Sequence, residues 1–499
     1  MTPRKRPASR RPKAAPDGPP LRLIVNGAPT EIRGVAAATT VLDWLREHAG
    51  LRGTKEGCAE GDCGACTVVV ERPGSKGTIV REPINACISM IGQLDGLAIR
   101  TVEGLSPESG PLHPVQAALA EGGATQCGFC TPGFVMSAYA FAAGGEPREP
   151  GRIHDALAGN LCRCTGYRPI VDALLNAAPA FSDPLERGRP KLGAALKAQA
   201  RRAGARFDHQ GRWFHAPSTF REALTLRAKH SDAVVLAGGT DVGLRVSRQR
   251  EVLPAIIHVG RIAALMSVKE DKRQIVFGAS VTCAGALDVL AALYPGLHTY
   301  LTRFGSRQIR SMATLGGNIA TASPIGDTLP ILLALDAKIK VSSAARGART
   351  VDADKFFTGY RRTALARDEL IESIAIPKPS PGTVLFADKV SKRRDQDIST
   401  LCGVFRLRSD GGLIREVRLA FGGMAATPRR ARTAEAALLG QRLDAAAFAT
   451  AGEHVAREFA PISDWRGSAE YRRAVARNLL QRLYLRLATP ESPLELDAL

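Results

Sequence analysis

The sequence lacks any run of about 18 uncharged apolar residues, so it predicts no transmembrane helix. Its first 20 residues carry six basic side chains and one acidic side chain but no apolar stretch typical of a signal peptide. No hydrophobic segment follows Arg10 and Arg11, as a twin-arginine leader would require. We therefore expect a cytoplasmic protein in a reducing compartment, where clustered cysteines bind metal more often than they form disulfides.

Aromatic residues are scarce, at 5%, and no basic stripe with interleaved aromatic side chains accompanies the net charge of +20. This argues against a nucleic-acid partner. A solvated surface, anionic cofactors and an acidic partner chain account for the charge as well. Residues 1–20 are expected to form a disordered basic tail.

Cysteines are unevenly distributed. Eight of the ten lie between Cys58 and Cys164. Cys283 and Cys402 have no partner at metal-ligand spacing and are expected to be ordinary core or surface residues.

The length of 499 residues predicts about three or four domains. Asn26-Gly27 between two apolar runs predicts a β-hairpin, and the next glycine-rich loop leads into a strand at 67–70. Four short helical segments then suggest a bundle. The expected divisions are a tail at 1–20, a small sheet domain at 21–95, a helical domain at 96–180, a linker at 181–210, an α/β or α+β domain at 211–380 and a last α+β domain at 381–490.

The first cysteine set is Cys58-x4-Cys63-x2-Cys66, with Cys87 twenty-one residues beyond. This is the spacing of a plant-type [2Fe–2S] ferredoxin loop. Glycines at 57, 61 and 64 would allow the backbone to approach the cluster sulfurs closely. A zinc knuckle is the alternative, but the x4 spacing and the distant fourth cysteine favour iron and sulfur.

The second cysteine set pairs Cys127-x2-Cys130 with Cys162-x1-Cys164. Each pair stands just before a helix that begins with proline. Two helical hairpins would then present four thiolates, and the helix N-termini would favour a negatively charged cluster. From the residues alone, an iron–sulfur cluster and a zinc ion both remain open.

A glycine turn at 237–241 follows a strand and precedes a helix start, which suits the binding of a pyrophosphate. The motif is not G-x-G-x-x-G, and a simple tight turn is the alternative. A second turn, Thr314 to Asn318, makes a long diphosphate-bridged ligand more credible.

The sequence resembles the molybdenum hydroxylases. The resemblance is carried by EGCAEGDCGAC at 56–66, QCGFCTPG at 126–133, GNLCRCTGY at 159–167 and VVLAGGTD at 234–241. It implies a multidomain α+β protein with a β-grasp ferredoxin-like domain, a four-helix [2Fe–2S] domain, a vanillyl-alcohol-oxidase-type FAD domain and an α+β C-terminal flavoprotein domain.

The resemblance also implies ligands. Both cysteine sets would bind [2Fe–2S] clusters, and Gln126 would face a molybdopterin on another chain. The basic loop after Lys389 would lie near the flavin, with a solvated loop as the alternative. The implied FAD contacts are Val235, Leu236, Ala237, Gly238, Gly239, Thr240, Asp241, Phe304, Thr314, Gly316, Gly317, Asn318, Asp327, Ile371 and Lys389.

The implied function is that of an electron-transfer small subunit in the oxidation of hypoxanthine and xanthine to urate. Electrons would pass from a molybdopterin-binding large subunit to the second cysteine set, then to the first set, then to FAD and NAD. The expected assembly is a heterotetramer of two small and two large subunits. The alternatives are a subunit of another molybdenum hydroxylase acting on aldehydes or N-heterocycles, a molybdenum-independent iron–sulfur flavoprotein reductase, and a zinc-stabilised binding protein.

Overall fold

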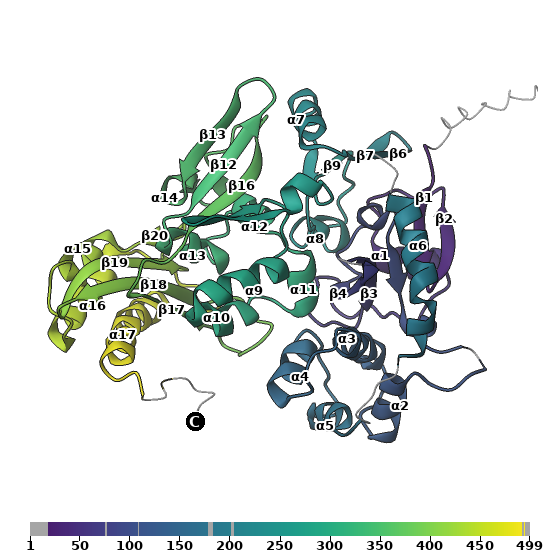
Figure 1. Cartoon of the computed structure of the whole chain (residues 1–499), viewed down its shortest axis with the longest axis horizontal. Helices are drawn as coiled ribbons and strands as arrows, with labels where there is room; N and C mark the ends of the chain where they lie inside the picture. Colours follow the sequence, from purple (N-terminus) through teal and green to yellow (C-terminus); the bar gives the residue numbers. More distant parts are fainter. Residues whose placement is uncertain are drawn as a thin grey trace, which may run out of the picture.

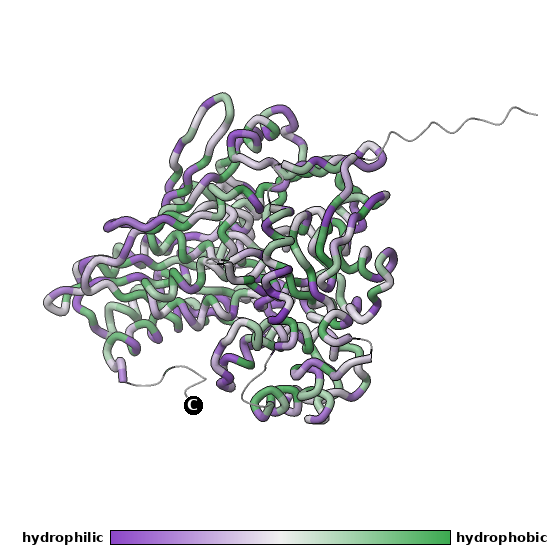
Figure 2. The backbone as a smooth tube through the Cα atoms, turned by 45° about the vertical axis from the view of Figure 1, so that its right-hand side comes forward, coloured by the Kyte–Doolittle hydropathy of each residue, from purple (hydrophilic) through white to green (hydrophobic). Residues whose placement is uncertain are grey.

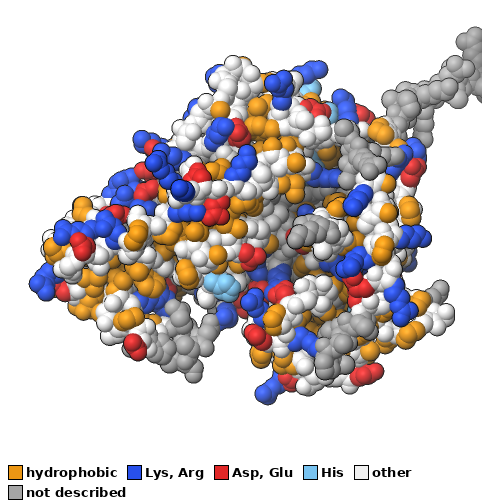
Figure 3. Space-filling model, in the orientation of Figure 1, with side chains coloured by type: hydrophobic (Ala, Val, Ile, Leu, Met, Phe, Trp, Pro, Cys, Tyr) orange, Lys and Arg blue, Asp and Glu red, His pale blue; other side chains and the backbone are white. Residues whose placement is uncertain are grey.

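The computed structural model describes residues 18–491 and 494, except 75, 76, 108, 178–182 and 201–203. The expected tail at 1–20 lies outside the described residues apart from its last three positions. Within the described part of the chain, no helix has the length and apolar character needed to cross a membrane. Lys and Arg side chains are spread over several parts of the face seen in Figure 3, rather than gathered in one patch of it.

The first domain is a five-stranded sheet in the order β2-β1-β5-β3-β4. Asn26 and Gly27 form the predicted hairpin turn, both with positive φ, because a tight two-residue turn requires that region. Strand β1 pairs with β5 in parallel, which gives the expected β-grasp arrangement. The elements are β1 (Leu21–Val25), β2 (Ala28–Ile32), α1 (Val41–Asp43) continued by a π-helical turn (Trp44–His48), β3 (Thr67–Pro73), β4 (Ile79–Asn85), a 3-10 turn (Ile91–Leu94) and β5 (Ala98–Arg100).

The second domain has the four predicted helices, which lie below β3 and β4 in Figure 1. Each carries proline at its first or second position, where the missing N–H costs nothing. The central helix, α3, is buried over most of its length. The bounds are α2 (Pro114–Glu121), α3 (Thr131–Ala143), α4 (Pro150–Leu157) and α5 (Arg168–Asn176).

The third domain contains two main sheets, ordered β6-β7-β9-β8 and β10-β11-β16-β12-β13. Its strands are β6 (Ala205–His209), β7 (Arg212–Ala216), β8 (Val234–Leu236), β9 (Ala255–His258), β10 (Val268–Glu270), β11 (Gln274–Gly278), β12 (Lys338–Ser343), β13 (Gly347–Asp352), β14 (Phe357–Gly359), β15 (Arg362–Thr363) and β16 (Leu370–Pro377). Its helices are α7 (Phe220–Lys229), α8 (Val242–Ser247), α9 (Cys283–Leu293), α10 (His298–Thr302), α11 (Arg307–Met312), α12 (Leu315–Thr321), α13 (Thr328–Ala334) and α14 (Ala353–Phe356).

The C-terminal domain is a four-stranded antiparallel sheet covered by three helices, at the left of Figure 1. Its elements are β17 (Thr383–Val390), β18 (Leu401–Asp410), β19 (Leu413–Gly422), β20 (Arg429–Arg430), α15 (Arg432–Leu438), α16 (Ala445–Glu458) and α17 (Ala469–Ala488). Apolar segments run through the interior of each domain, whereas the hydrophilic segments lie mainly at the periphery in Figure 2.

The segment at 181–210 is more than the expected linker. It contains a 3-10 turn (Pro184–Gly188) and helix α6 (Arg189–Ala200), and β6 already belongs to the third domain's sheet. Leu196 of α6 is buried against Ile24 and Ala98 of the first domain. Sequence reasoning missed this helix because its Ala- and Lys-rich composition resembles that of a solvated connector.

Helix α11 joins the third domain to the helical domain through ion pairs. Arg307 Nε lies 2.6 Å from one oxygen of Asp155 in α4, and Arg310 Nη2 lies 2.7 Å from the other. Arg307 also pairs with Glu146. Burial by itself would raise the pKa of Asp155, but the charges of Arg310 and Arg307 outweigh it and hold the pKa below its ordinary value.

Asp155→Asn should therefore lower the stability of the domain junction by about 1–2 kcal/mol at pH 7, since Asp155 is partly exposed and Arg310 is buried. The pKa of Asp155 is lower in the folded state than in the unfolded state. The stability that its ion pairs contribute is therefore fully present above the unfolded-state pKa of about 4, and it is lost as the pH falls through the folded-state pKa. Urea unfolding of both proteins at pH 7 and at successively lower pH measures this. Asp208→Asn, at the exposed pair with Arg206, is the control. A gap between Asp155→Asn and the unaltered chain that stays constant as the pH falls would contradict the assignment.

Candidate functional site

The first cysteine set converges. Cys58, Cys63 and Cys66 lie in the loop between the π-helical turn and β3, and Cys87 follows β4. The Cys58 thiol lies within hydrogen-bonding reach of Cys63 and Cys87, and Cys66 lies within reach of Cys87. The sheet therefore brings the distant fourth cysteine to the loop, as the spacing predicts.

Backbone conformation in this loop turns N–H groups toward sulfur. Ala59, Gly61 and Gly64 have positive φ, and the N–H groups of residues 60, 62 and 63 each lie 3.4 Å from the Cys58 sulfur. Hydrogen bonds from Cys63 and Cys87 lower the pKa of Cys58 below that of an ordinary thiol. The loop thus stabilises a thiolate at Cys58, the form of cysteine that binds metal.

The second cysteine set also converges, in two touching pairs. Cys130, which caps α3, contacts Cys162, and Cys127 contacts Cys164. Thr165 donates its N–H and its hydroxyl to the Cys162 sulfur, at 3.5 and 3.1 Å. Cys127 and Cys164 are exposed, whereas no cysteine of the first set is, so solvent reaches the second set at this one pair.

The two cysteine loops touch each other through their backbones. The N–H of Leu161 donates to the carbonyl of Cys63 at 2.9 Å, and the Asn160 amide donates to the carbonyl of Gly64 at 3.1 Å. A methyl group at Gly64 would overlap the carbonyl of Gly159. A methyl group at Gly133 would likewise overlap the Gly64 carbonyl. We call Gly64, Gly133 and Gly159 the glycine junction.

A buried polar network surrounds the glycine junction and includes all three neighbouring domains. The side-chain nitrogen of Gln308 in α11 lies 3.1 Å from an oxygen of each of Thr67, Ser137 and Asn160, which share its two N–H donors. Ser137 also donates to Asn160 at 2.6 Å, and Thr67 donates to the Gly64 carbonyl at 2.6 Å. These bonds fix the loops in one relative position, because each buried polar group depends on the others.

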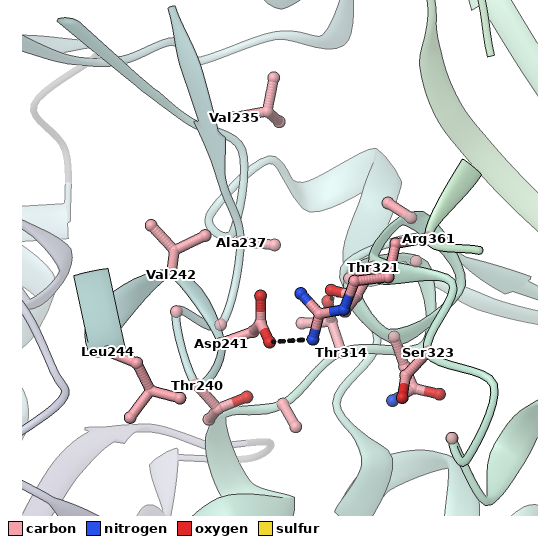
Figure 4. Close-up of a pocket in the computed structure, with 18 of the residues that line it drawn as sticks. Val235, Ala237, Thr240, Asp241, Val242, Leu244, Thr314, Thr321, Ser323 and Arg361 are labelled. Carbon is pink, nitrogen blue, oxygen red and sulfur yellow. Dashed lines mark hydrogen bonds and ion pairs between the residues drawn. The ribbon is translucent and has the colours of Figure 1, made fainter. Parts of the chain in front are cut away.

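A cavity of about 1150 Å³ lies in the third domain beside the first cysteine loop. Figure 4 shows residues from the two predicted glycine turns facing one another across it, with an ion pair of 3.5 Å between Asp241 and Arg361. Of the predicted FAD contacts, Leu236 alone does not line the cavity; it is fully buried in the core, as its place at the end of β8 requires. The predicted residues that do line it are Val235, Ala237, Gly238, Gly239, Thr240, Asp241, Phe304, Thr314, Gly316, Gly317, Asn318, Asp327, Ile371 and Lys389.

The two glycine turns offer different chemistry to a ligand. Within the described residues, the N–H groups of Gly238 and Gly239 donate to no protein acceptor, although both residues line the cavity. In the second turn, the N–H of Gly316 donates to Ala279 and that of Gly317 to the Thr314 hydroxyl. The first turn therefore has the free donors that a pyrophosphate needs.

Lys389 is buried rather than solvated. Its ammonium lies 2.8 Å from Asp327, which also accepts a hydrogen bond of 2.5 Å from Ser399. The solvated-loop alternative fits residues 392–395, which are exposed, but not Lys389. Sequence reasoning missed Ser399, because its partner lies 72 residues away and no motif marks it.

The first cysteine loop reaches the cavity. Residues 60–62 lie in its lining, and Gln396 donates to the Asp62 carbonyl at 2.9 Å. The cavity, the first cysteine set and the second cysteine set therefore follow one another through direct contacts. The resemblance to a known family implied this order, which the spacing alone could not give.

Cys283 and Cys402 lie apart from both sets. Both are buried, and burial raises the pKa of each thiol to about 12, so they stay protonated. They are core residues, as expected.

Four family models match the chain in sequence order. A "2Fe-2S iron-sulfur cluster binding domain" matches residues 23–91, and a "[2Fe-2S] binding domain" matches 101–175. A "FAD binding domain in molybdopterin dehydrogenase" matches 206–379, and a "CO dehydrogenase flavoprotein C-terminal domain" matches 386–487. The chain therefore has two [2Fe–2S]-binding domains and one FAD-binding domain, and the predicted fold class is confirmed.

Curated relatives include xanthine dehydrogenase of Drosophila subobscura, 33% identical over 94% of this chain and 39% of that protein. Xanthine dehydrogenase/oxidase of Mus musculus is 35% identical over 81% of this chain and 34% of that protein. The chain thus spans about two fifths or less of the length of these relatives.

Solved structures with similar folds include carbon monoxide dehydrogenase from Hydrogenophaga pseudoflava, with a TM-score of 0.52 and 30% identity. The match covers 54% of this chain and 94% of that chain. Quinoline 2-oxidoreductase from Pseudomonas putida 86 has a TM-score of 0.51 and 26% identity, covering 55% of this chain and 96% of that chain.

Gly64→Ala should separate the two cysteine loops, because its methyl group would overlap the Gly159 carbonyl. Gly50→Ala is the matched control, since Gly50 has φ +70° against +68° at Gly64 but nothing within 4 Å of an added methyl group. Both variants carry the cost of a left-handed backbone, so the overlap alone should make Gly64→Ala about 1–3 kcal/mol less stable than the control. Equal urea midpoints for the two variants would show that the junction does not need its glycine.

Proposed function

The chain belongs to the molybdenum hydroxylase family as an oxidoreductase component with two [2Fe–2S] domains and an FAD domain, and we propose that it is the small subunit of a xanthine dehydrogenase. It would carry electrons from a molybdopterin-binding large subunit through the two clusters to FAD and on to NAD, as hypoxanthine and xanthine are oxidised to urate. One observation carries this proposal: a cysteine set with two exposed members, a cysteine set with none, and a nucleotide-sized cavity lie in direct succession.

The chain's own residues would hold and position these groups. The eight clustered cysteines would supply the thiolates, four to each cluster, and the loop N–H groups would stabilise the charge on sulfur. The free N–H groups of Gly238 and Gly239 and the cavity that both glycine turns line would receive FAD. FAD, when bound, would link one-electron clusters to a two-electron hydride acceptor.

The exposed end of this succession supports the proposed partner. Cys127 and Cys164 are exposed, as are Phe129 and Tyr167 beside them. An electron donor on another chain could thus approach the second set closely, and Gln126, also exposed, would face its molybdopterin. We propose two small and two large subunits in the complex, in the cytoplasm.

A subunit of a different molybdenum hydroxylase is the alternative. The similarity to carbon monoxide dehydrogenase and to quinoline 2-oxidoreductase supports it, because the same architecture occurs beside other substrates. The longer and more similar matches to xanthine dehydrogenases favour the purine substrate. The substrate pocket itself would lie on the partner.

Purification of the chain with its partner tests the proposal. The complex should contain iron, molybdenum and FAD, and should reduce NAD⁺ when xanthine is supplied. Turnover of an aldehyde or an N-heterocycle without turnover of xanthine would contradict the proposed purine substrate. A chain that purifies alone, lacks molybdenum and oxidises NADH would contradict the proposed molybdopterin-binding partner.

Cys162→Ser should remove the second cluster while leaving the first, because the two sets share no ligand. Iron should fall from about four to about two per chain, and one of two [2Fe–2S] signals should disappear from the electron paramagnetic resonance spectrum of the reduced protein. Cys66→Ser should remove the other signal.

Cys283→Ala is the matched control, since Cys283 is a buried cysteine outside both sets and should leave the iron content unchanged. Loss of iron from this control, or full iron retention in Cys162→Ser, would contradict the ligand assignment.

A further inference from the structure

Gln93 of the first domain contacts the glycine turn of the third domain. Its side-chain nitrogen lies 3.1 Å from the carbonyl oxygens of both Ala237 and Gly238, 144 and 145 residues away. Its side-chain oxygen accepts the N–H of Met90 at 2.9 Å. Gln93 is only 4% exposed, so water does not compete for these bonds.

The orientation of the Gln93 amide follows from its partners. A backbone N–H can only donate, so the oxygen must face Met90. Backbone carbonyls can only accept, so the nitrogen must face Ala237 and Gly238. No other orientation satisfies all three backbone groups.

This contact, together with a hydrogen bond from the His258 ring to the Ala237 carbonyl, determines where the turn's N–H groups point. In a trans peptide the carbonyl and the following N–H are antiparallel. With the carbonyls of Ala237 and Gly238 held by Gln93, the N–H groups of Gly238 and Gly239 point to the opposite side. Among the described residues these two N–H groups have no protein acceptor, and both glycines line the cavity.

The turn is closely packed on its other faces. A methyl group at Gly238 would overlap the carbonyl of Met312, and one at Gly239 would lie 3.0 Å from the Gln93 oxygen. Gly239 also has φ +84°, which favours glycine. The turn thus has little room to rotate as long as Gln93 is present.

We infer that Gln93 is a positioning residue that aims the N–H groups of Gly238 and Gly239 at the diphosphate of FAD. This inference rests on the proposed function, in which the cavity binds FAD. It also places a residue of the first iron–sulfur domain directly against the proposed flavin site.

The test compares FAD with riboflavin, which lacks the diphosphate. Binding is titrated on the full chain with its clusters intact and its flavin removed. Gln93→Met keeps the side-chain length and loses every hydrogen bond, so it should weaken FAD binding roughly tenfold. Riboflavin affinity should stay within about twofold, because riboflavin has no diphosphate for the N–H groups of the turn to bind.

Gln116→Met is the matched control. Gln116 occupies the same third position of a helical turn and accepts the N–H of His113 at 3.1 Å, as Gln93 accepts that of Met90. It makes no contact with the glycine turn among the described residues, so both flavin affinities should be unchanged.

Gln93→Glu is a second variant. If Gln93→Met loses cluster iron, the FAD and riboflavin affinities of Gln93→Glu are compared with those of the unaltered chain instead. Its carboxylate can still accept from Met90 but cannot donate to the carbonyls, and it adds a negative charge behind the turn. FAD binding should weaken at least as much as in Gln93→Met, again without loss of riboflavin affinity.

FAD affinity unchanged in the Gln93 variants would overturn the inference while the proposed function stands. Equal losses for FAD and riboflavin would also overturn it, because Gln93 would then only maintain the fold. An unaltered chain that binds neither flavin would overturn the proposed FAD site itself, and the inference with it.

Discussion

The two cysteine loops can touch because three side chains are absent at the glycine junction. Methyl groups at Gly64, Gly133 or Gly159 would each overlap a neighbouring atom, in two of the three cases a backbone carbonyl. The direct bond from the Leu161 N–H to the Cys63 carbonyl depends on that close approach. The polar network of Gln308, Ser137, Asn160 and Thr67 surrounds this point.

Helix α11 holds the junction from the side of the third domain. Gln308 enters the polar network, while Arg307 and Arg310 pair with carboxylates of the helical domain. Ile309 packs against the first domain's core. This one short helix therefore contacts all three domains. Its polar contacts fix the relative orientation of the domains, and Ile309 buries apolar surface.

Local patterns in the sequence predicted the cysteine sets, the hairpin at Asn26-Gly27 and the proline-headed helices, because a few neighbouring residues determine each of them. The resemblance to a known family supplied the predicted FAD contacts; all of them line the cavity except Leu236, whose side chain turns into the core. No motif or pattern in the sequence marked Gln93, Gln308 or Ser399 as part of the site. Each acts on a partner 72 to 241 residues away, and no periodicity or motif encodes such a meeting.

The environments of the two cysteine sets bear on the direction of the proposed electron transfer. Hydrogen bonds to sulfur and exposure to solvent both tune the reduction potential of a cluster. In the first set Cys66 and Cys87 are buried, and Cys58 receives three backbone N–H groups. In the second set Cys127 and Cys164 are exposed, and the buried Cys162 receives two bonds from Thr165. Placement separates the two sets more plainly: only the first loop reaches the cavity among the described residues, and only the second set has exposed cysteines. The proposed order of transfer follows this placement, which the glycine junction helps to fix.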